Sequence, residues 1–202
     1  MPIVAVAGLA AAYILAQRCG VRVFAFFGGT SVSMPFLDDI WINVAVLGGI
    51  LATSLALKQT QWEESKGTFR YLLFRPIARK ELFLSKIVVG LALVAVVMGA
   101  FILIYGVWAT LPGRHASPFY WSMTVPSWHA WFVLPAIYSA AFASGLRPGR
   151  WFGSKLLPLA GCVIIVFIWL VQPWPWIALL VSTLLTALYV SAALDVAESR
   201  DY

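Results

Sequence analysis

The chain has 202 residues, of which 62% are hydrophobic and only 11% are charged. Soluble domains are about 45–50% apolar and about 25% charged, and a soluble fold of this length could not cover so much apolar surface. The composition therefore excludes an ordinary soluble enzyme, a disordered tail and a secreted disulfide scaffold. It predicts a polytopic protein embedded in a lipid bilayer.

The cysteines and the net charge exclude further classes. Cys19 and Cys162 lie far apart and form no CxxC motif, so we expect neither a disulfide framework nor a metal site. The formal net charge is +6, but the basic residues fall between hydrophobic runs, as the positive-inside rule predicts for a membrane protein. We therefore expect no nucleic-acid partner and no bound cofactor.

The first 37 residues allow two topologies. An apolar run over 3–17 ends at Arg18 and Arg22, and a second apolar run over 23–37 is interrupted by two glycines and Pro35. If both runs cross the bilayer, the chain has seven spans. If 23–37 is an outer loop or a re-entrant segment, it has six, which we favour. A cleavable signal peptide is disfavoured because no basic n-region begins the chain.

Five further segments are apolar and close to the length of about 20 residues that a bilayer core of about 30 Å requires. They are residues 39–57, 87–111, 126–146, 156–172 and 174–194. Pro135 and Pro158 lie within two of these spans, and membrane helices tolerate such kinks. We find no internal repeat or long linker. The predicted fold is an all-α integral membrane protein with six transmembrane helices, or seven, in a single domain over 1–202.

The basic residues set the expected orientation. Residues 58–86, called the connector here, hold seven of the fourteen Lys and Arg residues, so we expect them in the cytoplasm. Alternation then places 112–125 outside, 147–155 inside, the turn over 173–176 outside and the C-terminal tail inside. The expected location is the plasma (inner) membrane, crossed several times.

Motifs for catalysis are absent from the sequence. His129 is the only ionisable residue well inside a predicted span, and no HExxH motif occurs. The segment 149–155 resembles a P-loop only superficially, because its spacing is wrong. We therefore expect that the chain does not hydrolyse ATP. A membrane-embedded lipid-modifying enzyme would need a cluster such as Asp38, Asp39, His115 and His129, whose spacing matches no motif.

The connector is patterned like a structured element. Phe69, Leu72 and Leu73 fall at i, i+3 and i+4, which places them on one face of a helix. Pro76 ends this helix or opens the next. The pattern predicts a short amphipathic helix, a proline corner, and then a membrane helix that begins near Ile87. Such an element can lie in the membrane interface or dock on a partner.

The connector also resembles the corresponding element in the membrane subunits of ABC type-two transporters. The order and spacing of eight residues carry the resemblance: Glu63, Gly67, Thr68, Leu72, Leu73, Pro76, Arg79 and Lys86. Ala78 departs from the pattern, which has a small hydroxyl residue before the arginine.

The resemblance implies a permease subunit. In that family the element is a coupling helix that docks on a separate ATP-binding subunit, and two permease subunits form a homodimer or heterodimer that encloses the path. The eight residues would then form the partner-coupling surface. Two alternatives stay open: an accessory or assembly subunit without transport, and the lipid-modifying enzyme. The uncharged spans favour an apolar or amphipathic substrate, such as a lipid or a hydrophobic peptide.

Overall fold

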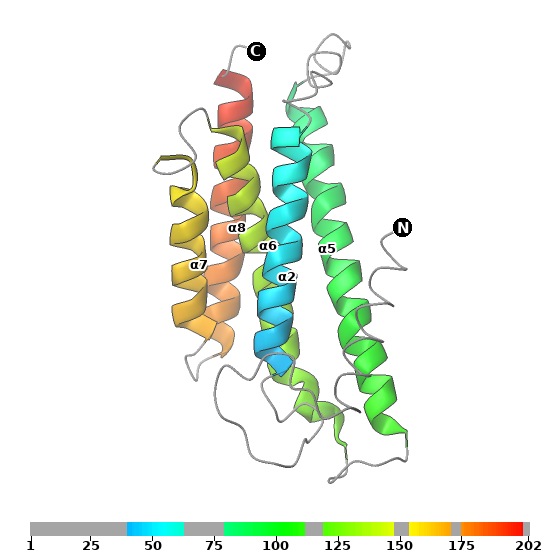
Figure 1. Ribbon diagram of the computed structural model, residues 1–202. Coiled ribbons are helices and arrows are strands. Elements are labelled where there is room, and N and C mark those ends of the chain that lie inside the picture. The colour runs from blue at the N-terminus through cyan, green and yellow to red at the C-terminus, as the bar shows by residue number, and fades with distance from the viewer. Residues whose placement is uncertain (1–39, 63–78, 112–118, 148–153, 171–174, 200–202) are drawn as a thin grey trace.

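The computed structural model describes residues 40–62, 79–111, 119–147, 154–170 and 175–199 (Figure 1). Within these ranges every regular element is helical. The α-helices are α2 (Ile40–Leu57), α5 (Arg79–Thr110), α6 (Val125–Leu146), α7 (Leu157–Leu170) and α8 (Pro175–Ser199). A π-helical turn, η1 (Lys58–Trp62), continues α2, and a 3-10 turn, η2 (Trp121–Thr124), leads into α6. The all-α class is confirmed for this part of the chain, whereas the two topologies of the first 37 residues lie outside it.

Each of the five segments predicted to cross the membrane after residue 38 forms a helix. Among the helices that the structure describes, four are long and apolar enough to span a bilayer: Ile40–Gln61, Lys80–Thr110, Trp121–Leu146 and Trp176–Val196. The fifth, α7, has 14 residues, or about 21 Å at 1.5 Å per residue. This is shorter than the hydrocarbon core of about 30 Å. A helix of that length crosses only where the bilayer thins or the flanking residues adapt.

One detail differs from the sequence prediction. The membrane span expected to begin near Ile87 is part of a helix that is already formed at Arg79, where the described residues resume, and that runs for 32 residues, or about 48 Å. Its charged first turns are helical because a change in hydropathy does not interrupt the backbone hydrogen bonds. Pro158 lies within the predicted span, in the first turn of α7, at a place where its missing N–H costs no hydrogen bond. Pro135, by contrast, lies inside α6.

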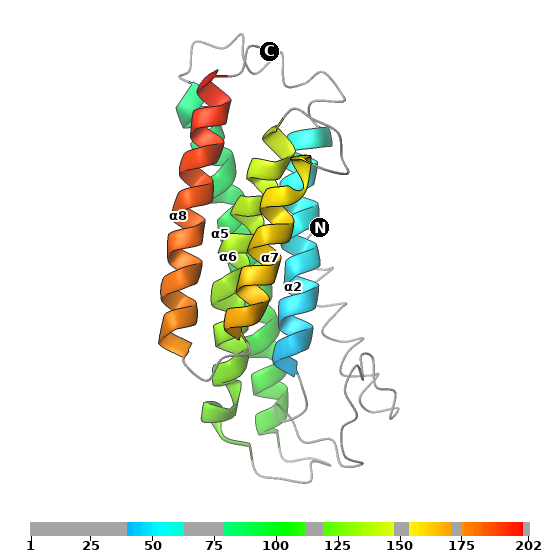
Figure 2. The same cartoon turned by 90° about the vertical axis from the view of Figure 1, so that its left-hand side faces the viewer.

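Helix α6 occupies the centre of the bundle. It packs against α2, α8, α7 and α5, and Figures 1 and 2 both show it between its neighbours. Along its span 78% of the residues are buried, against 17% along α8. Every residue from 136 to 146 is buried, and many are Ala, Ser or Gly. Small side chains let helix backbones approach closely where lipid provides no hydrophobic driving force.

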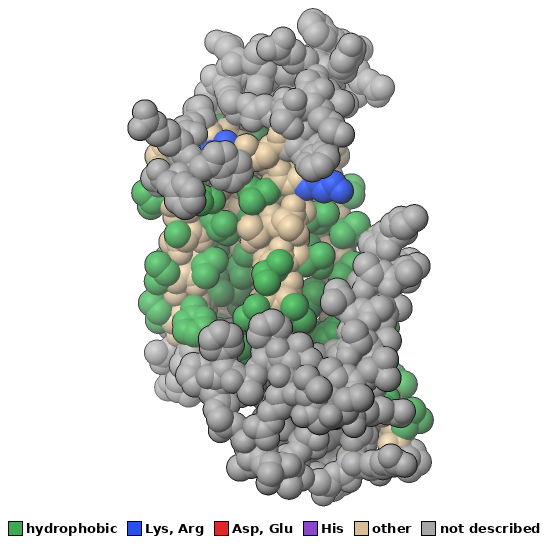
Figure 3. Space-filling model, viewed as in Figure 1, with side chains coloured by type: hydrophobic (Ala, Val, Ile, Leu, Met, Phe, Trp, Pro, Cys, Tyr) green, Lys and Arg blue, Asp and Glu red, His purple; other side chains and the backbone are tan. Residues whose placement is uncertain are grey.

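The outward sides of the other helices are apolar. Leu184 on α8, Phe167 on α7 and Val96 on α5 are 61%, 61% and 68% exposed. Figure 3 shows hydrophobic side chains over the middle of the visible face, with Lys and Arg confined to its upper part. A belt of exposed apolar side chains without charge suits contact with lipid.

Consecutive helices run in opposite directions. Figure 1 shows the C-terminal ends of α2–η1, α6 and α8 at the same end of the bundle as the N-terminal ends of α5 and α7. All Lys, Arg, Asp and Glu residues that the structure describes lie at this end, called the charged end below. They are Lys58, Arg79, Lys80, Glu81, Lys86, Arg147, Lys155, Asp195 and Glu198.

Candidate coupling site at the charged end

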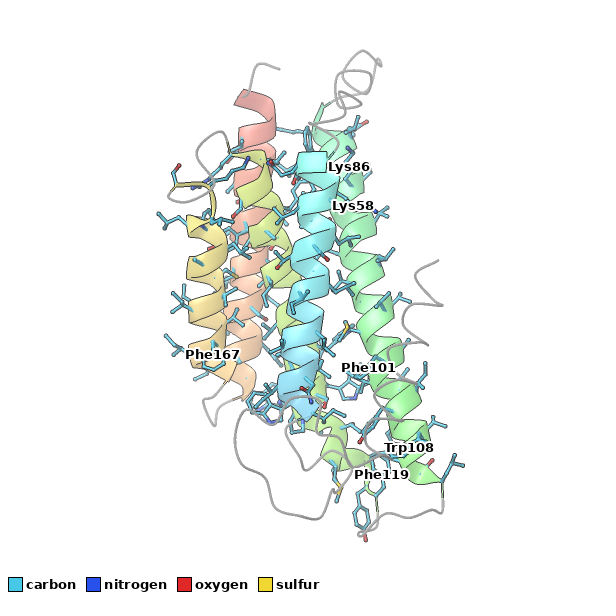
Figure 4. The ribbon with its side chains drawn as sticks, in the orientation of Figure 1. Lys58, Lys86, Phe101, Trp108, Phe119 and Phe167 are labelled. Atoms are coloured by element: carbon cyan, nitrogen blue, oxygen red, sulfur yellow. The ribbon has the colours of Figure 1, made fainter. Side chains whose placement is uncertain are left out.

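The predicted coupling residues are only partly within the described structure. Glu63, Gly67, Thr68, Leu72, Leu73 and Pro76 lie outside the described residues. Arg79 is the first residue of α5, and Lys86 lies two helical turns further along it. Figure 4 shows Lys86 and Lys58 on neighbouring helices near the charged end. The structure therefore describes both ends of the connector, η1 and the first turns of α5.

The connector begins in a π-helical turn. Such turns are rare and often mark functional positions in a helix. Here the turn carries three consecutive polar residues, Gln59, Thr60 and Gln61. Thr60 is only 3% exposed, and its hydroxyl donates to the carbonyl oxygen of Ala56 at 3.0 Å. The polar residues that follow the apolar part of α2 therefore turn into the protein.

Two of these residues contact Gly145 near the end of α6. Gln61 Nε2 donates a hydrogen bond to the Gly145 carbonyl oxygen, one of the last four carbonyls, which have no partner within a helix. Thr60 lies so close that a Cβ at position 145 would be 2.0 Å from Thr60 Oγ1. Glycine is therefore required at position 145 by the close approach of η1.

Tyr138 makes a second contact with η1, about two turns earlier on α6. Its side chain is 0% exposed, and its hydroxyl donates to Gln59 Oε1. The Tyr138 hydroxyl oxygen also lies 3.5 Å from the carbonyl oxygen of Lys86 on α5. A phenol has one proton, so these two acceptors share it, and Gln59 is the nearer. Tyr138 thus touches both helices that flank the undescribed part of the connector.

Helix α5 is shaped to receive the Tyr138 ring. A Cβ at Gly90 would lie 1.9 Å from Tyr138 Oη, so only glycine leaves room for the phenol. The Tyr138 and Phe142 ring centroids are 6.1 Å apart, and Phe142 meets Phe83 of α5 edge to face at 6.5 Å. Aromatic pairs at these separations attract one another. The first turns of α5 are therefore held to α6 by polar and aromatic contacts together.

A separate set of contacts joins α6, α7 and α8 at the same end. The Leu159 backbone N–H donates to Ser144 Oγ at 3.2 Å, and the Tyr189 hydroxyl donates to the Pro158 carbonyl oxygen at 3.1 Å. Lys155, just before α7, is only 8% exposed. These contacts fix α7 and α8 but do not reach the connector.

The opposite end of the bundle is rich in aromatic residues. Trp128 and Trp131 meet edge to face at 5.6 Å, and the Trp131 indole N–H donates to the Ala95 carbonyl oxygen of α5 at 2.9 Å. Figure 4 shows Trp108 and Phe119 at this end. Aromatic residues with a polar edge are typical of a membrane interface.

The cluster that a lipid-modifying enzyme would need is only partly within the described structure. His129 lies on α6 toward the aromatic-rich end, whereas Asp38, Asp39 and His115 are outside the described residues. Among the residues that the structure describes, no three His, Cys, Asp or Glu side chains gather closely enough to hold a metal ion.

Comparison with protein families places the chain. A family described as "ABC-2 family transporter protein" matches residues 2–169, which is 168 of the 202 residues. The chain belongs to the ABC-2 transporter family. It is accordingly a multi-pass membrane protein and a component of a transporter. The match begins at residue 2 and ends within α7, so α8 lies beyond it. Comparisons with curated proteins and with solved structures find no match.

The sequence interpretation missed Gln59, Gln61 and Tyr138. The sequence did contain a signal for these residues. Polar groups at membrane depth need hydrogen-bond partners, and the two glutamines follow an apolar run while the tyrosine lies within another. Their partners could not be identified from the sequence, since Gln59 and Tyr138 are separated by 79 positions.

Proposed function

We propose that this chain is the permease subunit of an ABC-2 transporter, driven by a separate ATP-binding subunit that docks at the charged end. The family match over residues 2–169 carries the proposal. All charged residues that the structure describes cluster at the end of the bundle to which the connector is joined. This clustering supports the proposal, because a charged surface at the membrane boundary suits docking of a water-soluble partner. Six of the nine charged residues there are basic, so the positive-inside rule favours the cytoplasm for this end.

In the proposal the energy for transport comes from another chain. The sequence contains no P-loop with the spacing that ATP binding requires. In the proposal the connector forms the docking element, with Glu63, Gly67 and Thr68 before its apolar face and Pro76 after it. Leu72 and Leu73 enter a groove on the partner, and Arg79 and Lys86 pair with acidic groups or lipid phosphates.

A second permease subunit completes the translocation path. The described helices pack closely around α6, and their outward sides are apolar. A path for a substrate therefore lies more naturally between two such chains than within one. The second chain is a copy of this one or a related permease.

The test is purification of the chain from its native membrane, followed by mass spectrometry. We expect one co-purifying protein with a Walker A motif, whose ATP hydrolysis increases when it is assembled with this chain. Arg79→Glu reverses a charge in the connector and should lower the recovered partner about tenfold, which corresponds to about 1.4 kcal/mol of binding energy. Arg114→Glu, on the side predicted to be extracellular, is the matched control and should leave recovery unchanged.

Gly67→Trp tests the same surface by bulk. The control is Gly161→Trp, because a Cβ at Gly161 meets nothing within 4 Å. Recovery of a Walker-motif partner at wild-type levels in both connector variants would refute docking through the connector. A partner that binds normally but hydrolyses ATP at the same rate with and without this chain would favour the accessory-subunit alternative.

A further inference from the structure

We infer that Tyr138 is a positioning residue that fastens both ends of the connector to the central helix α6. The inference deepens the proposed function, since it identifies the link through which motion of the connector reaches the membrane helices. It rests on the proposed function only for the source of that motion, because the contacts themselves belong to the chain alone.

The position of Tyr138 relative to the connector is the first argument. The undescribed part, 63–78, leaves η1 at Trp62 and enters α5 at Arg79. The Tyr138 hydroxyl contacts Gln59 just before the first point and the Lys86 carbonyl oxygen two turns after the second. One oxygen atom therefore lies between the two ends of the connector.

The second argument is that Tyr138 cannot move aside cheaply. The side chain is fully buried, with Gly90 against its hydroxyl and Phe142 beside its ring. A buried hydroxyl that loses its partners bears the full cost of desolvation, and hydrogen bonds are stronger in a medium of low dielectric constant. Displacement of either end of the connector must therefore displace α6 or break these bonds.

The third argument concerns the pattern of contacts along α6. Tyr138, Phe142 and Gly145 occupy positions i, i+4 and i+7, which share one face of a helix. This face holds η1 at two heights, through Gln59 and through Gln61. The same face contacts α5 at the Lys86 carbonyl oxygen. The Tyr138 hydroxyl thus makes a polar contact with both ends of the connector.

The consequence follows from the packing of α6, which contacts each of the other α-helices that the structure describes. A partner that shifts the connector would shift α6 with it and so bias the whole bundle toward another arrangement. Without the Tyr138 hydroxyl the first turns of α5 could move independently of η1, and part of the motion would not reach α6.

The first experiment measures the separation of the two ends in the chain alone. Spin labels are attached at Ser54→Cys on α2 and Ser85→Cys on α5. Both serines are exposed and donate only to a carbonyl of their own helix. Cys19 and Cys162 are first replaced by Ser and Ala. Double electron–electron resonance in lipid nanodiscs then gives the distribution of distances between the labels.

The variants remove single groups. Tyr138→Phe deletes only the hydroxyl, and Gln59→Leu deletes its nearer acceptor without touching α6. Tyr189→Phe is the matched control. It removes a tyrosine hydroxyl whose hydrogen bond, to the Pro158 carbonyl oxygen, joins α8 to α7 and does not involve the connector. We expect the distance distribution to broaden or shift in the first two variants and not in the control. An unchanged distribution in both Tyr138→Phe and Gln59→Leu, or an equal change in Tyr189→Phe, overturns the inference.

The second experiment uses the complex with the ATP-binding subunit. A label at Ser122→Cys, an exposed position in η2 just before α6, reports the distance between the two copies of the chain. Adding ATP and vanadate should shift this distance in the unsubstituted complex. The shift should be smaller in Tyr138→Phe while the partner remains bound. Absence of the shift in the unsubstituted complex, or a shift of unchanged size in Tyr138→Phe, overturns the transmission role. If no ATP-binding chain assembles, the proposed function fails, and the first experiment still decides the positioning role.

Discussion

Replacement of Gly90 by alanine tests the closest contact between α5 and α6. A Cβ at position 90 would lie 1.9 Å from Tyr138 Oη, 2.3 Å from Cζ and 2.8 Å from Cε2. Real Cβ atoms do not approach other heavy atoms so closely, so the helices must separate or the ring must move. Because Tyr138 is 0% exposed, its ring has no open space into which it can retreat.

The expected cost follows from three terms. Inserting a methyl group into a filled core costs about 1–3 kcal/mol. Displacing the hydroxyl from Gln59 and the Lys86 carbonyl oxygen costs about 1 kcal/mol more. Alanine recovers about 1 kcal/mol because it favours a helix over glycine. The free energy of unfolding of Gly90→Ala should therefore fall by about 1–3 kcal/mol.

The matched control is Gly99→Ala on the same helix. There the nearest atoms to a new Cβ are Trp131 Nε1 at 3.6 Å and Cε2 at 3.9 Å, which are ordinary contacts. This variant should be neutral or more stable by up to about 1 kcal/mol. Reversible unfolding in mixed micelles with increasing dodecyl sulfate, followed by circular dichroism, gives both values.

The double variant Gly90→Ala/Tyr138→Phe should recover part of the loss. It removes the atom at 1.9 Å but leaves the ring carbon at 2.3 Å, so rescue is incomplete and the two substitutions are not additive. Equal unfolding free energies for Gly90→Ala and Gly99→Ala would refute the packing of Tyr138 against α5.

Two further substitutions test the contacts of α6. Trp131→Phe removes the indole donor to the Ala95 carbonyl oxygen and should lower the unfolding free energy by about 1 kcal/mol. Trp176→Phe, at a side chain 78% exposed, should change it little, and equal effects would contradict the interhelical bond. Leu134→Ala empties a site that is 1% exposed and should cost about 2 kcal/mol or more. Leu184→Ala on the lipid-facing side of α8 should be close to neutral in the same micelle titration, and a comparable loss there would contradict the assignment of its face to lipid.

Hydropathy predicted the helical segments well because lipid leaves the backbone no other partner for its hydrogen bonds than its own helix. The run 126–146 became α6, Val125–Leu146, within one residue. The start of α5 was less predictable. Apolar character begins near Ile87, but the chain is already helical at Arg79, because helical hydrogen bonding continues through charged residues wherever no proline interrupts it.

The candidate site was predictable only in part. The sequence pointed to the connector, and Arg79 and Lys86 lie at the charged end as alternation of the spans predicts. The role of Tyr138 could not be predicted, since a tyrosine in an apolar run is equally suited to an interface or a core. Its contacts depend on glycine at position 90 and on glutamine at position 59, which the chain brings together only when three helices pack.

The sequence alone determined that this protein lies in a membrane. A chain of this length that is 62% hydrophobic and 11% charged cannot bury enough of its apolar surface to fold in water. The sequence also determined where the helices of the described residues lie and which segment carries the basic residues, since both depend on local composition. The tertiary structure alone decided that α6 is the central helix and that its Tyr138 joins η1 to α5. Hydropathy distinguishes lipid from water but does not distinguish lipid from a neighbouring helix, and only close packing of small residues selects among apolar helices.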